Sequence, residues 1–103
     1  MSDVNVTPRS FTMRSTETLP LVFDATNLLA AGETPSSPSA LLTDLYTKEV
    51  YAAGLSGNPT VSGDDITQTV TGLQPGRNYR LAITFTAAAG KIWTMILNIS
   101  CPS

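Results

Sequence analysis

The residues that could carry chemistry in this 103-residue chain are few, and they form no catalytic pattern. The chain has no histidine, which removes Ser–His and Cys–His nucleophiles, the usual zinc ligands and the usual general base near neutral pH. Asp64 and Asp65 are adjacent, so on a strand they point to opposite faces and cannot share a proton. Within Ser-Gly-Asp-Asp they read as turn formers, with weak calcium binding as the alternative.

The other reactive side chains are isolated along the sequence. Cys101 is the single cysteine, so it cannot form a disulfide within the chain. We interpret it as a small apolar residue that ends a strand, and the alternative is an intermolecular bridge or a metal ligand. The chain also lacks glycine-rich phosphate-binding loops. We therefore expect no enzyme, no metal site and no cofactor.

Charge and hydropathy exclude two further classes of partner. Six basic and eight acidic residues give a net charge of −2, and no two basic residues are adjacent, so we expect no nucleic-acid binding. No apolar stretch approaches the ~20 residues that span a bilayer, and the first residues do not resemble a signal peptide. Only 14% of the residues are charged, which fits a surface covered by partners or one kept soluble by Ser, Thr and Asn.

The C-terminal third carries the clearest elements. Residues 80–86 place Leu81, Ile83 and Phe85 on one face, the period of a half-buried strand. After a short loop ending in Gly90, residues 91–99 form a second strand, so the pattern predicts a hairpin. In this second strand Ile92 and Ile96 make the other face apolar as well, which indicates a covered or central strand. Trp93 reads as a core residue, with an exposed interface anchor as the alternative.

A Pro-Gly turn separates two predicted strands. Pro75 and Gly76 fit a type II turn, and Leu73 precedes them. Tyr79 follows at the start of a strand, where its hydroxyl can bind a nearby backbone group. This is the tyrosine corner of immunoglobulin-like sandwiches, and Leu73, Pro75, Gly76 and Tyr79 also resemble the corner of fibronectin type III modules. The alternative for Tyr79 is an ordinary half-buried strand residue.

Short strands separated by frequent turns predict an all-β fold. We expect an immunoglobulin/fibronectin III-like antiparallel sandwich of about seven strands in residues 17–103. Residues 1–16 are expected to form an N-terminal arm with a possible first strand. Residues 56–59 and 62–65 read as turns, and residues 32–39 as a proline-rich loop. We expect contacts with other proteins through the arm, the loop and the second apolar face; the candidate interface residues are Phe11, Met13, Pro35, Pro38, Ile92 and Ile96.

A longer pattern resembles a family of small tailed-bacteriophage structural proteins, the fibre–tail adaptors. It covers roughly residues 19–100 and consists of Phe23-Asp24, Leu28-Leu29, Gly32-Glu33-Thr34, Gly72, Gly76, Tyr79, Thr84, Thr86 and Gly90. Glu33 departs from the aspartate usual in that family.

The resemblance implies a virion component made in the host cytoplasm. It would dock on tail, neck, fibre or major capsid proteins in many symmetric copies, as a fibre–tail or neck adaptor. The alternatives are a capsid decoration (cement) protein on the head, or an Ig-like module that binds carbohydrate or a cell surface.

Overall fold

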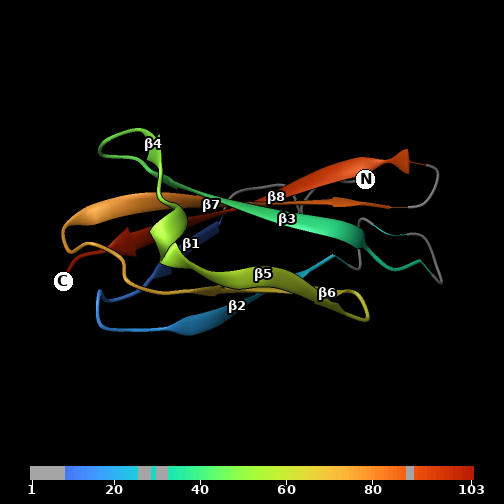
Figure 1. Ribbon diagram of the computed structural model, residues 1–103, viewed down its shortest axis with the longest axis horizontal. Helices are drawn as coiled ribbons and strands as arrows, with labels where there is room; N and C mark the ends of the chain where they lie inside the picture. The colour runs from blue at the N-terminus through green and yellow to red at the C-terminus, as the bar shows by residue number, and fades with distance from the viewer. Residues whose placement is uncertain (1–8, 26–28, 30–32, 88–89) are drawn as a thin grey trace.

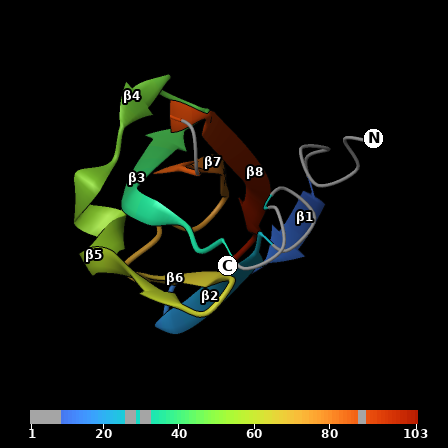
Figure 2. The same cartoon turned by 90° about the vertical axis from the view of Figure 1, so that its right-hand side faces the viewer.

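The computed structural model describes residues 9–25, 29, 33–87 and 90–103. Their strands form two packed sheets, a β-sandwich (Figures 1 and 2). The five-stranded sheet has the order β1 (Arg9–Thr12), β8 (Ile92–Cys101), β7 (Arg77–Thr86), β3 (Ser36–Asp44) and β4 (Glu49–Val50). The three-stranded sheet has the order β2 (Leu19–Asp24), β6 (Asp65–Val70) and β5 (Leu55–Ser62), and a 3₁₀ turn, η3 (Ala52–Gly54), precedes β5. No helix of the described residues could span a membrane.

The β7–β8 hairpin is the centre of the larger sheet, as the alternating pattern predicts. Its antiparallel register runs from Arg77 opposite Cys101 to Thr86 opposite Ile92. Leu81, Ile83 and Phe85 are buried while the residues between them are half-buried, so one face of β7 packs on the core. Because a period of two is fixed by strand geometry, local sequence was sufficient to predict this element.

The core lies between the two sheets. Its buried members are Met13, Leu21, Phe23, Ala25, Leu42, Ile66, Val70, Leu73, Tyr79, Leu81, Ile83, Phe85, Met95, Ile99 and Cys101. The polar side chain of Gln68 is also buried, and its amide donates to the carbonyls of Gly57 (3.2 Å) and Thr69 (2.9 Å). These bonds offset part of the cost of burying an amide.

Strand β1 is part of the sandwich, and this corrects one interface prediction. It runs parallel to β8, and the amide of Met13 donates to the carbonyl of Ser100 at 2.9 Å. The side chain of Met13 is 0% exposed because it inserts between the sheets. Met13, expected at an interface, is therefore a core residue. Residues 1–8 of the predicted arm lie outside the described residues.

Two segments expected to be turns or loops are strands. Residues 36–39 open β3, with a register shift between Ser36 and Ser39 and a positive φ of 50° at Ser37. Residues 56–59 belong to β5, which has a similar shift between Ser56 and Thr60. Proline and glycine are tolerated in both places because bulges and edge strands leave backbone groups unpaired. By contrast, the turn predicted at residues 62–65 does connect β5 to β6, with Gly63 at φ 61°.

Candidate functional site

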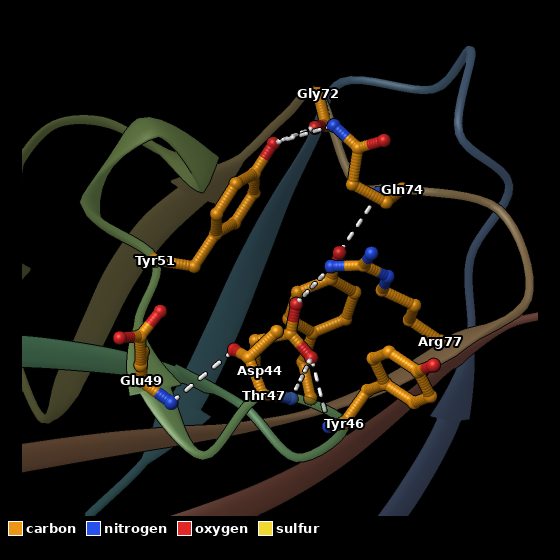
Figure 3. A network of polar contacts seen from close by, with 9 residues as sticks. Asp44, Tyr46, Thr47, Glu49, Tyr51, Gly72, Gln74 and Arg77 are labelled. Carbon is orange, nitrogen blue, oxygen red and sulfur yellow. Dashed lines mark hydrogen bonds and ion pairs between the residues drawn. The ribbon is translucent and has the colours of Figure 1, made fainter.

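A cluster of polar side chains lies where the β3–β4 and β6–β7 connections meet (Figure 3). Asp44 is the last residue of β3, and its side chain is only 4% exposed. Its Oδ2 forms an ion pair with Nη1 of Arg77 at 2.8 Å. Its other oxygen accepts the backbone amides of Tyr46 at 2.8 Å and Thr47 at 3.4 Å. The carboxylate therefore closes its own turn and binds the first residue of β7.

The titration of Asp44 reflects this enclosure. Burial alone would raise the pKa of its carboxyl, but the hydrogen bond from Arg77 and the two backbone amides outweigh burial and lower the pKa below 3.8. The same pair raises the pKa of Arg77. A carboxylate that is ionised and already bonded on both oxygens is a poor general base, since a base needs a pKa near the working pH.

Two tyrosines extend the cluster to the next loop. The Tyr51 hydroxyl donates to the carbonyl of Gly72 at 2.6 Å and accepts a longer 3.4 Å bond from the side-chain amide of Gln74. The Tyr79 hydroxyl accepts the backbone amide of Gln74 at 2.8 Å, and the two tyrosine rings lie 5.5 Å apart. The hydrogen bond expected for Tyr79 is thus present. The cluster joins the β3–β4 and β6–β7 connections through polar groups that bind one another.

The turn beside Tyr79 has the expected geometry. Gly76 has a φ of 78°, the left-handed conformation that a type II turn requires at this position. Its amide donates to the carbonyl of Cys101 at 2.6 Å, which fastens the turn to the end of β8. Leu73 is buried beneath the turn, and Pro75 is exposed. The four corner residues therefore act together at one end of the sandwich.

The outer face of the five-stranded sheet carries an apolar row. The registers place Leu41 of β3, Ala82 of β7 and Ile96 of β8 directly beside one another. Leu41 is 49% exposed and Ile92, further along β8, is 69% exposed, while Ile96 is half-buried. We call Leu41, Ala82, Ile92 and Ile96 the outer apolar surface. Of the sequence-predicted interface residues, it contains Ile92 and Ile96.

The remaining interface candidates lie apart from this surface. Phe11 is half-buried and packs against the core, Pro35 is buried, and Pro38 is half-buried within β3. Trp93 is also half-buried against the core. Neither the arm nor the proline-rich loop therefore offers an exposed apolar side chain among the described residues.

The structure also places the residues that the sequence offered for chemistry, Cys101, Asp64 and Asp65. Cys101 is a buried free thiol at the end of β8, and burial raises its pKa. Asp64 and Asp65 are half-buried at the β5–β6 turn. The described residues contain no group of three or more possible metal ligands.

Sequence analysis missed the Asp44–Arg77 pair and the exposure of Leu41 and Tyr46. The pair joins residues 33 positions apart, and no local pattern signals such a contact. Tyr46 is 75% exposed, and the guanidinium of Arg77 lies 4.9 Å from the centre of its ring. The local sequence shows only that Tyr46 lies two residues after Asp44, the last residue of β3.

No protein-family model matches the chain, and no curated protein is significantly similar to it in sequence.

Proposed function

We propose that this chain is a non-enzymatic structural protein of a bacteriophage virion that docks on other virion proteins as a fibre–tail or neck adaptor. The fold we propose is immunoglobulin-like. In support, the order β8-β7-β3-β4 against β2-β6-β5 corresponds to strands G-F-C-C′ against B-E-D of such domains. The Tyr79 corner at the start of β7 matches the usual place, strand F.

The observation that carries a docking role is the outer apolar surface. Leu41 and Ile92 are exposed on the open face of the larger sheet. The apolar row of Leu41, Ala82 and Ile96 is continuous across three strands, and an apolar row on the open face of a sheet is suited to contact with another protein. The polar cluster at Asp44 does not favour an enzymatic function, because its charged groups already bind one another. The kind of partner is proposed from the resemblance of the residue pattern between Phe23 and Gly90 alone, since no family model matches the chain.

Incorporation into particles tests this function. Leu41→Lys places a charge in the apolar row, whereas Val22→Lys places it at a 60% exposed apolar position of β2, in the other sheet. We expect Leu41→Lys to reduce the number of copies in purified particles about tenfold or more, since a desolvated charge weakens docking strongly. Val22→Lys should be incorporated normally, because β2 belongs to the other sheet.

The N-terminal segment gives a second test. Deleting residues 1–8 removes no described core residue, so the domain should stay folded. We expect incorporation to be lost, because extended arms fasten proteins to neighbours by strand addition. Full occupancy after both Leu41→Lys and the deletion contradicts the docking role. Imaging that locates the chain on the head supports decoration of the capsid instead of adaptation at the tail.

A further inference from the structure

Arg80 lies in the middle of the outer face of the five-stranded sheet. It belongs to β7, the central strand, and its side chain is exposed on the side opposite the core, because its neighbours Tyr79 and Leu81 are buried. The registers place Thr43 of β3 and Asn98 of β8 directly on either side of Arg80. The next outward row along these strands is the apolar one, Leu41, Ala82 and Ile96. A partner that covers the outer apolar surface therefore also covers Arg80.

The guanidinium of Arg80 is available to such a partner. Within the described part of the chain, no hydrogen bond or ion pair holds its side chain. Asn98 lies directly opposite on β8, yet its Oδ1 accepts no hydrogen bond, so Arg80 does not donate to it across the strands. Arg77 of the same strand differs, since its guanidinium already binds Asp44 at 2.8 Å.

The outer face around Arg80 is otherwise neutral. Among the described residues of the five strands, Arg80 carries the only charge on this side, and the others are serine, threonine, asparagine or apolar residues. The acidic strand residues lie elsewhere: Glu49 pairs with the buried Asp44, and Asp24 pairs with Asp65 in the smaller sheet. Although the whole chain has a net charge of −2, this face is positive.

Docking on the outer apolar surface removes water from Arg80. A charge that leaves water is costly unless an opposite charge pairs with it. A neutral partner surface would leave the guanidinium desolvated and unpaired, and a basic one would add repulsion between like charges. A carboxylate compensates for the lost water, because the planar guanidinium can donate to both of its oxygens.

We propose that the partner of this face is a protein surface that presents an aspartate or glutamate carboxylate to Arg80, with apolar side chains beside it that cover Leu41 and Ile96. The proposal rests on the docking role proposed above and names the chemistry of the partner. A protein supplies the anion, since nucleic-acid binding needs several cations along a phosphate backbone and this face has one cation beside an apolar row. The ion pair sets which part of the partner lies over β7, and the apolar row supplies contact area.

Cosedimentation of the purified full chain with particles that lack it measures docking. We expect Arg80→Leu and Arg80→Gln to bind about tenfold more weakly or worse than the native chain, because each leaves the partner's carboxylate desolvated without its cation. A purely apolar partner would instead bind Arg80→Leu at least as tightly as the native chain. Arg14→Leu is the matched control, the same change at an exposed arginine between β1 and β2, and it should bind like the native chain.

Leu41→Lys separates failure of the ion pair from failure of the docking role. If Leu41→Lys is lost from the particles while both Arg80 variants bind like the native chain, the docking role stands and the pairing with a carboxylate is wrong. If the native chain itself does not bind the particles, the virion role fails, and this proposal fails with it.

Carbodiimide coupling identifies the partner's carboxylate. Arg80→Lys keeps the positive charge and supplies an amine, which carbodiimide joins only to a carboxylate in direct contact. We expect mass spectrometry of coupled particles to find position 80 joined to an aspartate or glutamate of another virion protein. Val22→Lys, on β2 of the smaller sheet, should give no such product at position 22. Docked Arg80→Lys chains in which position 80 couples to no carboxylate overturn the proposal.

Discussion

Replacing Tyr79 by phenylalanine removes one hydroxyl and leaves the ring in place. The ring is fully buried and packs 5.5 Å from that of Tyr51, so the substitution creates no large cavity. What is lost is the 2.8 Å hydrogen bond from the Gln74 amide. The side chain of Tyr79 is buried, which raises the pKa of its hydroxyl.

The cost follows from that single bond. A hydrogen bond of this kind contributes about 0.5–1.5 kcal/mol to stability, and an orphaned buried donor costs about 1–3 kcal/mol. Gln74 is exposed, so water can reach its amide after a small movement of the loop, and the lower range applies. We expect a loss of about 1 kcal/mol in the free energy of unfolding.

Urea denaturation of the native and variant chains measures this loss. With a slope of about 1–3 kcal/mol per molar urea, the midpoint should fall by roughly 0.3–1 M. Tyr46→Phe is the matched control, since the same hydroxyl is removed from a ring that is 75% exposed, and its midpoint should not move. An unchanged midpoint for Tyr79→Phe would show that the corner bond does not stabilise the fold.

Two further predictions concern the core and the buried ion pair. Met13→Ala should destabilise the domain by about 2–5 kcal/mol in the same assay, because Met13 is a core residue. The control Ser10→Ala, on the exposed face of β1, should cost less than about 0.5 kcal/mol. Equal losses of stability in the two variants would refute the assignment of β1 to the sandwich. The pKa of Asp44 is lower in the folded chain than its usual 3.8, so its contribution to stability is present above pH 3.8 and is lost as the pH falls through the folded value. The urea midpoint of the native chain should therefore decrease in acid more steeply than that of Asp44→Asn, and parallel curves for the two chains contradict the ion-pair argument.

Elements with a strong local period were predictable from sequence. The β7–β8 hairpin and the turn before β6 both follow from residues near one another in the chain. The Tyr79 corner was also predictable, since its bond spans only five positions.

The errors arose where distant strands decide the conformation. Residues 56–59 contain Gly57 and Pro59 and read as a turn, yet pairing with β6 draws them into a bulged strand. Met13 has little local apolar context and is buried only because β8, the last strand, lies beside it. The exposure of Leu41 is set by the side of β3 that faces outward, and this depends on the register with β7.

The pairing of β1 with β8 has a consequence for synthesis of the chain. Residue 9 pairs with residue 97, and the Ser15 amide binds the carbonyl of Ser103. The first described strand therefore has no partner until residues 97–100 of β8 have left the ribosome. Bringing such distant segments together is entropically costly, which makes folds rich in non-local contacts slow to form. Before β8 is in place Met13 has no core to pack against, so β8 completes the core for the first strand as well as for β7.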